Sequence, residues 1–428
     1  MKNPFIIILK TCRIFYYEGI HGLLIRVRGR LIRKTAITDS TVTRDSERKV
    51  WEKSILNGLE ATKMVVLDDF QTVDEKLDHN SSNLTLLMLV PPPERGSGGR
   101  MTMARILKKL TESGIKCYVA FYPEVPDHNF KKYEHEWMDE FDFAPNECSI
   151  LKYAEATERS FDIAVATFWP SAYAIKYQIK ARSKGYLVQD FEPYFYPPGS
   201  HYAFSEDSYR LGLWGLCASP WLAKKLSQEY KMQTVGFELG VDKREYHQLS
   251  DVKRDKKLVI AYIRQHTERR GYELVMWSLK KIKEQVPDVR IEVFGDPHLP
   301  IGDFLWIDKN HGILSHEELC KLYNYASVGI VTSFTNYSLI PNEMISCGCA
   351  VVDLDTECMK SVFPDAAISL AHPTPKSIAD AVKKLLHDNS LHESQVLAGL
   401  KYIEKVDWER SLEKINIAVR NFSKIDAV

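Results

Sequence analysis

The feature that most constrains the fold of this 428-residue chain is a repeated alternation of short apolar runs with helical patterns. It begins at Leu84–Val90, an apolar run followed by three prolines, which cannot continue a strand ladder. A glycine-rich turn, a helical pattern over Met101–Glu112 and a second apolar run over Cys117–Tyr122 come next. Strand, helix and strand in this order form the unit of a doubly wound parallel sheet, so the sequence predicts an α/β fold.

The alternation continues along the chain and predicts the remaining elements. In the first half we expect strands at 161–168, 185–189 and 216–218 and helices at 171–183 and 220–230. In the second half we expect strands at 257–263, 289–295, 328–332 and 350–354 and helices at 272–285, 315–325, 341–347 and 375–387. A terminal helical segment covers 400–428, with Trp408 in its middle part.

This pattern predicts two consecutive α/β domains after an N-terminal extension. The helical, basic extension covers residues 1–80, the first domain covers 81–248, and the second covers 249–404. The C-terminal helix, 405–428, is expected to complete the first domain.

Composition excludes some classes of partner and site. Lys and Arg together number 57, as do Asp and Glu, so no global field favours nucleic acid, and we expect no nucleic-acid partner. Most of the eight cysteines stand alone in apolar segments, which is typical of reduced, buried thiols in a cytoplasmic protein. Cys347 and Cys349 lack a second pair at zinc-like spacing.

The first 34 residues leave two interpretations open. Their longest early apolar run, Phe5–Leu9, is too short to span a bilayer or to form a signal-peptide core. This segment contains eight Lys and Arg residues but a single acidic residue, Glu18, and aromatic and aliphatic residues lie between the basic ones. Such a segment can lie on the inner face of the cell membrane, or it can be a helix packed on the protein with a solvated basic face.

Candidate anion-binding residues follow two strands, and open parallel sheets bind ligands beyond the carboxyl ends of their strands. Gly98 and Gly99 precede a helix, where glycine lets the backbone approach an anion; an ordinary flexible turn is the alternative. Arg264 ends a strand, and Arg269-Arg270 precede the next helix. Guanidinium groups there can hold a diphosphate, although an arginine pair in a loop can also be simply solvated.

Carboxylates follow two other strands. Glu343 lies in the first turn of a predicted helix, where it can accept hydrogen bonds from sugar or ribose hydroxyls or simply complement the helix dipole. Asp190 and Glu192 can orient or deprotonate an acceptor hydroxyl, and the neighbouring Tyr194 and Tyr196 can stack on a sugar ring. A structural loop is the alternative for this second group.

At these residues the sequence resembles GT-B glycosyltransferases of the family 4 type. It resembles more closely the rhamnosyltransferases that build bacterial surface glycans, such as S-layer glycans, from dTDP-rhamnose. The stretches that carry the resemblance are residues 188–197, 217–222, 262–264, 269–271, 312–319 and 335–344. The last of them is specific to the superfamily, and the string from Gln189 to Pro197 is specific to the subgroup.

The resemblance implies a GT-B fold, in which two Rossmann-like, doubly wound domains face a cleft. The donor nucleotide sits mainly on the second domain. By position, Arg264 and Arg270 match basic residues that hold the donor diphosphate. Ser338 and Leu339 match the loop whose backbone meets the phosphates, and Asn336 belongs to the same loop.

Further roles follow from the same resemblance. Glu343 matches the carboxylate that binds the pentose, Gly98 and Gly99 match a loop near the diphosphate, and Leu314 falls where the base is usually held. The C-terminal helix is expected to cross back onto the first domain. This sequence departs from the broader pattern at Thr335, where a glutamate often helps to hold the donor sugar.

The resemblance suggests retention at the anomeric centre, with Asp190, Glu192 and Glu343 as the candidate catalytic residues. If the reaction inverts instead, Asp190 or Glu192 is the candidate base. Asp353-x-Asp355 has the spacing of a metal motif but lies beyond the donor loop. Basic groups and helix dipoles can stabilise the leaving diphosphate, so we expect no metal or other cofactor.

The expected function is transfer of a hexosyl residue, L-rhamnose from dTDP-rhamnose, to a saccharide acceptor of a bacterial surface polysaccharide. We expect a cytoplasmic enzyme with a lipid-linked acceptor at the inner leaflet, motivated by the basic N-terminal segment. Two alternatives stay open. One is a non-catalytic nucleotide-sugar-binding or scaffold protein, motivated by Thr335, and the other is an epimerase that shares the fold.

Overall fold

The computed structural model describes residues 59–60, 62–69, 84–92, 98–144 and 147–424. The predicted contact of residues 1–34 with a membrane therefore lies outside the described residues. Both sheets belong to one compact unit, Val65–Val428. A short 3-10 helix, Lys63–Asp69, is described before the first sheet.

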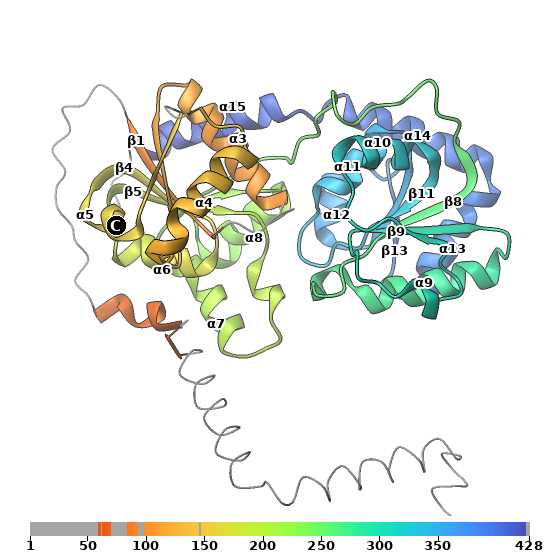
Figure 1. Ribbon diagram of the computed structural model, residues 1–428, viewed down its shortest axis with the longest axis horizontal. Helices are drawn as coiled ribbons and strands as arrows, with labels where there is room; N and C mark the ends of the chain where they lie inside the picture. The colour runs from red at the N-terminus through yellow and green to blue at the C-terminus, as the bar shows by residue number, and fades with distance from the viewer. Residues whose placement is uncertain (1–58, 61, 70–83, 93–97, 145–146, 425–428) are drawn as a thin grey trace, which may run out of the picture. The chain divides into compact units, whose positions relative to one another are not determined.

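The first half of the chain forms a seven-stranded parallel sheet (Figure 1). Its strands, in the spatial order β3-β2-β1-β4-β5-β6-β7, make a doubly wound sheet whose strand order reverses between β1 and β4. They are β1 Thr85–Val90, β2 Lys116–Phe121, β3 Cys148–Leu151, β4 Ser160–Ala166, β5 Lys180–Val188, β6 Trp214–Cys217 and β7 Thr234–Gly236. The helices of this half are α3 Gly98–Glu112, α4 Asp127–Glu140, α5 Tyr153–Glu158, α6 Trp169–Tyr177, α7 Ser200–Asp207 and α8 Pro220–Tyr230.

The second half repeats the arrangement with a six-stranded parallel sheet in the order β10-β9-β8-β11-β12-β13. Its strands are β8 Asp255–Tyr262, β9 Arg290–Phe294, β10 Lys309–Asn310, β11 Ala326–Ile330, β12 Ala350–Leu354 and β13 Ser369–Ala371. Its helices are α9 Tyr272–Gln285, α10 His316–Tyr325, α11 Leu339–Ser346, α12 Glu357–Val362, α13 Pro375–His387 and α14 Asn389–Ile403. The strand order reverses between β8 and β11.

The central strands are buried, as the apolar runs in the sequence predict. Leu86–Val90 in β1 and Leu258–Ala261 in β8 are almost fully inaccessible to solvent. Parallel sheets carry helices on both faces, so their strands are continuously apolar. The seven described cysteines are buried and free of disulfides, as expected for structural thiols.

Three predicted elements are wrong in their extent: the helix at 171–183, the strand at 185–189 and the terminal helix at 400–428. The helix expected at 171–183 ends at Tyr177, and the polar stretch from Lys180 already belongs to β5. Its backbone pairs with β4, and Trp214 Nε1 donates to the buried Ser183 Oγ, so burial of one face overrides its polar composition.

The terminal segment is also not one helix. The break between α14 and the final helix α15, Trp408–Phe422, occurs at residues 404–407, where the Asp407 side chain accepts a hydrogen bond from Glu409 N. Trp408 therefore starts α15 instead of lying midway along a longer helix.

Helix α15 packs on elements of the first sheet although it follows the second (Figure 1). It contacts α3, and the Phe422 ring stacks on Trp214 with 4.6 Å between centroids. Ser183 Oγ donates to the Phe422 carbonyl at 2.8 Å. Among the described residues, no helix is long and apolar enough to cross a membrane.

Replacing Phe422 with alanine should destabilise the protein, because the change removes a ring that stacks on Trp214. Only 8% of Phe422 is exposed to solvent. The expected loss is about 3–5 kcal/mol in the free energy of unfolding, measured by denaturant titration. Ile417→Ala on the same helix is the control, since Ile417 is 53% exposed. Equal losses in the two variants would contradict the proposed anchoring by Phe422.

Candidate functional site

The predicted site residues gather at the carboxyl ends of strands in both sheets. Gly98 follows β1, Asp190 follows β5, Arg264 follows β8, and Ser338 follows β11. These ends include the two points where strand order reverses, between β1 and β4 and between β8 and β11. Doubly wound folds bind ligands at such points.

The N-termini of two helices, one after a strand of each sheet, lie close together here. Gly98 and Gly99 form the first turn of α3, and Leu339 begins α11. A Cβ added to Gly98 would lie 3.5 Å from Leu339 Cδ1, and one added to Gly99 would lie 3.2 Å from Gln189 Oε1. The start of a helix offers unpaired N–H groups and the positive end of the helix dipole, so this junction favours an anion.

Ser338 adds an unused hydrogen-bonding group at the start of α11. It is the N-cap residue of that helix, but its side chain makes no capping bond. Its Oγ is buried without a hydrogen-bond partner among the described residues. A buried polar atom without a partner is costly, so a ligand that bonds to this hydroxyl would stabilise the site.

The arginines divide into two kinds. The guanidinium groups of Arg264 and Arg270 have no ion-pair or hydrogen-bond partner among the described residues, which leaves them available to an anionic ligand. Burial lowers the pKa of Arg270, and the neighbouring Arg269 lowers it further. Arg269 itself pairs with Asp190 at 3.4 Å and lies 4.7 Å from the centre of the Phe195 ring. The resemblance assigned Arg270 and not Arg269 to the diphosphate, and the ion pair of Arg269 with Asp190 was not predicted from the sequence.

Asp190 reaches from the loop after β5 in the first sheet to the loop after β11 in the second. Its Oδ1 accepts a hydrogen bond of 2.6 Å from Thr335 Oγ1. Burial raises the pKa of Asp190, while Arg269 and the Thr335 hydroxyl act in the opposite direction. A carboxylate thus lies against Thr335, the position where the sequence departs from the broader pattern.

Glu192 is held by the protein itself. Trp169 N donates to its Oε2 at 2.8 Å, at the start of α6, and the Tyr186 hydroxyl donates to its Oε1. The side chain is buried, and burial raises its pKa to about 7. Since both carboxylate oxygens already accept bonds, the structure places Glu192 as a support for the loop that carries Asp190.

The predicted acceptor tyrosines differ in exposure. Tyr194 is 47% exposed and packs edge-on against Phe191. Tyr196 accepts a hydrogen bond from Trp169 Nε1 at 3.0 Å and stacks on His201, with 5.4 Å between ring centroids. The exposed His201 was not singled out from the sequence, because its contact with Tyr196 depends on how α7 folds back.

Glu343 and Leu314 lie on the second sheet. Glu343 is partly buried on α11, and this burial raises its pKa to about 8, with Arg105 opposing the shift and Glu245 adding to it. Leu314 packs partly buried against the core. Asn336, also predicted to bind the donor, uses its side chain for contacts within the protein instead of pointing an open group toward a ligand.

The Asp353-x-Asp355 pair has structural contacts. Asp353 accepts hydrogen bonds from Ser333 N and Ser333 Oγ, and Asp355 pairs with Lys360. Burial raises the pKa of Asp353 to about 7. Within the part of the chain that the structure describes, no cluster of three or more His, Cys, Asp or Glu residues could hold a metal.

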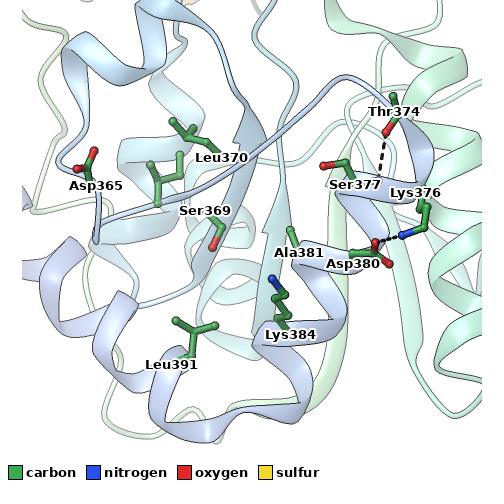
Figure 2. A pocket seen from close by; sticks show the side chains of 11 residues that line it. Asp365, Ser369, Leu370, Thr374, Lys376, Ser377, Asp380, Ala381, Lys384 and Leu391 are labelled. Carbon is green, nitrogen blue, oxygen red and sulfur yellow. Dashed lines mark hydrogen bonds and ion pairs between the residues drawn. The ribbon is translucent and has the colours of Figure 1, made fainter.

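A cavity of about 610 Å³ lies away from these residues, beside the edge strand β13 and between α13 and α14 (Figure 2). Lys384 and Ala381 reach it from α13, and Leu391 from α14. Lys376 and Asp380 on its rim pair with each other. None of the predicted site residues lines it.

Comparison with known proteins gives one family and one curated relative. Residues 257–383 match the family described as WsaF, C-terminal domain. The O-antigen biosynthesis protein RfbC of Myxococcus xanthus is 28% identical over 258 residues, 59% of this chain and 20% of that protein. The chain therefore spans about a fifth of the length of this curated relative.

The two-sheet body resembles solved structures, two of which match with a TM-score of 0.60. Sucrose-phosphate synthase (tll1590) from Thermosynechococcus elongatus matches with a TM-score of 0.60 at 13% identity, over 79% of this chain and 99% of that chain. Anabaena Alr3699/HepE in complex with UDP and glucose matches with a TM-score of 0.60 at 12% identity, over 79% and 100%. The predicted GT-B fold with two Rossmann-like domains is thus confirmed.

The raised pKa of Glu343 predicts how stability depends on pH. Between the ordinary pKa of 4.5 and about 8, the folded protein keeps a proton that the unfolded chain has released. The free energy of unfolding therefore falls as pH rises through this range. Glu343→Gln cannot ionise, so we expect it to match the wild type near pH 4 and to exceed it above pH 8 by more than about 1 kcal/mol.

Denaturant titration at both pH values would measure this difference, with Glu393→Gln as the control. Glu393 is exposed on α14, and its replacement should change stability little at either pH. A Glu343→Gln difference that is the same at both pH values would show that folding leaves the pKa of Glu343 unshifted.

Proposed function

We propose that the protein is a glycosyltransferase that moves a hexosyl residue from a nucleoside diphosphate sugar to a saccharide acceptor of a cell-surface polysaccharide. The observation that carries the proposal is the junction of the α3 and α11 N-termini with the unpartnered Ser338 hydroxyl, together with the unpaired Arg264 after β8 and Arg270 before α9. These groups suit a diphosphate. The matches to the WsaF C-terminal domain and to an O-antigen biosynthesis protein support the same class.

In this proposal the positive groups stabilise the charge that develops on the departing diphosphate. Helix N-termini and guanidinium groups are held in place before the reaction, so little reorganisation is needed as the glycosidic bond breaks. Glu343 accepts hydrogen bonds from the pentose hydroxyls, and Leu314 contacts the base. No step requires a metal ion.

The acceptor is proposed to bind on the first sheet. Tyr194 and Tyr196 offer aromatic faces to a sugar ring, and Asp190 offers a carboxylate to an acceptor or donor hydroxyl. Both carboxylates already accept hydrogen bonds from the protein. If the reaction inverts, Asp190 is the stronger candidate for the base, because its side chain is partly exposed whereas Glu192 is buried. Retention stays the outcome that the resemblance favours.

The finer parts of the proposal are L-rhamnose as the sugar, dTDP as the nucleotide and a lipid-linked acceptor at the membrane. They rest on the string from Gln189 to Pro197 and on the basic N-terminal segment. Thr335 motivated a non-catalytic scaffold as the alternative, but Thr335 donates to Asp190, so this position has a carboxylate beside it. That contact favours the enzyme.

Calorimetric titration with dTDP, UDP and GDP tests the donor site. We expect preferential binding of dTDP, weakened roughly 10- to 150-fold in Arg264→Ala, since a hydrogen bond to a charged group contributes about 1.5–3 kcal/mol. Glu343→Ala should also weaken binding. Arg290→Ala is the control, because Arg290 starts β9 and pairs with Asp255 and Glu292 away from these residues.

Each result of the titration has a defined meaning. Preference for UDP or GDP would keep the class of enzyme and overturn the proposed sugar. An unchanged affinity in Arg264→Ala would remove Arg264 from the donor site. If none of the three nucleotides binds, the glycosyltransferase proposal fails.

Removal of divalent metal should leave turnover unchanged, because the proposed site stabilises the diphosphate with fixed positive groups. The measurement is the release of nucleoside diphosphate from a nucleotide sugar before and after dialysis against EDTA. Loss of turnover that manganese restores would contradict this part of the proposal.

A further inference from the structure

Several contacts join the two sheets at the loop between β11 and α11, residues 331–338, called the donor loop, and one of them is a buried amide. Asn336 Nδ2 donates two hydrogen bonds of 2.8 Å, one to the carbonyl of Gln189 and one to the carbonyl of Ala218. These carbonyls directly follow β5 and β6, at the carboxyl end of the first sheet. Asn336 belongs to the loop that follows β11 in the second sheet, and it is 2% exposed.

Every polar atom of this side chain is used. Cys358 Sγ donates to Asn336 Oδ1 at 2.9 Å, so the amide nitrogen faces two acceptors and the amide oxygen faces one donor. The reverse orientation of the amide would set its oxygen against two carbonyls. Removing the side chain would leave both carbonyls buried without these partners, which is the costly case for a hydrogen bond.

Further contacts nearby join loops of the second sheet to the Asp190 loop of the first. Thr335, beside Asn336, donates to Asp190, beside Gln189. Arg269 also pairs with Asp190 and lies over the Phe195 ring. Thr335 and Asn336 of the donor loop therefore both bond to the loop after β5, which carries the proposed acceptor residues.

We propose that Asn336 is a positioning residue that holds the donor loop against the strand ends of the first sheet. The α3 and α11 N-termini then lie next to each other before any donor binds. In the proposed function, on which this inference rests, the diphosphate then meets a preformed site and needs no wide closure of the two domains. Asn336 acts through the loop that carries Ser338 and Leu339, without touching the donor by its own side chain.

Asn324 provides a matched control. It is also buried, its Nδ2 donates to the carbonyls of His247 and Cys320, and its Oδ1 accepts from Leu249 N. Each alanine variant therefore loses two bonds donated to backbone carbonyls and one bond accepted by the amide oxygen. Only the Asn336 bonds reach the strand ends of the first sheet.

The experiment compares the full-length wild type, Asn336→Ala and Asn324→Ala by small-angle X-ray scattering and thermal unfolding, with and without dTDP. We expect similar drops in melting temperature for both variants. The radius of gyration should rise in Asn336→Ala alone and should not change in the wild type when dTDP is added. With a nucleotide sugar, kcat should fall on the order of 10- to 100-fold in Asn336→Ala beyond any loss in Asn324→Ala.

An equal radius of gyration in Asn336→Ala and the wild type would overturn the proposal, as would a clear decrease in the wild type on adding dTDP. If Asn336→Ala does not fold, Asn336→Asp serves instead, because its carboxylate opposes two carbonyls when charged and can donate to one when protonated. Its radius of gyration should then be larger at pH 8 than at pH 5, and a constant value would overturn the proposal. The scattering needs no catalysis, so failure of the glycosyltransferase proposal remains distinguishable.

Discussion

The candidate site depends on how the carboxyl ends of two parallel sheets are held against each other, and the buried Asn336 amide bonds to the ends of two strands of the first sheet. A carbonyl that ends a strand has no further ladder partner, so it must find a donor elsewhere. Gln189 and Ala218 find theirs on the other sheet. The requirement to satisfy backbone groups thereby fixes where the donor loop lies.

Charge at this junction is unevenly compensated. Arg269 has Asp190 as its partner, whereas Arg264 and Arg270 have none among the described residues. Burial raises the pKa of Asp353, a carboxyl that interacts with Arg270, to about 7, which reduces the negative charge that could neutralise this arginine. Together with two helix N-termini, this arrangement favours an anion that carries several oxygens.

The sequence predicted elements well where local pattern and burial agree. Ala350–Leu354 and Pro375–His387 have the predicted bounds, because a buried apolar run and a capped amphipathic helix are each visible in a short window. β5 was misassigned in its first part, since the burial of Ser183 depends on Trp214 and Phe422, which are distant in sequence. The contacts of Asp190 with Thr335 and Arg269 were likewise invisible, because they join separate sheets. The strand-end rule predicts where the candidate site lies, but it could not show which groups there are already paired.

A crystal structure of the protein with a nucleoside diphosphate, solved with dTDP and with UDP, tests the central claim most directly. The account predicts that the diphosphate lies between the starts of α3 and α11, within hydrogen-bond distance of Ser338 Oγ and of the guanidinium groups of Arg264 and Arg270. A nucleotide bound elsewhere, such as in the cavity beside β13, with these groups left unoccupied, would contradict it.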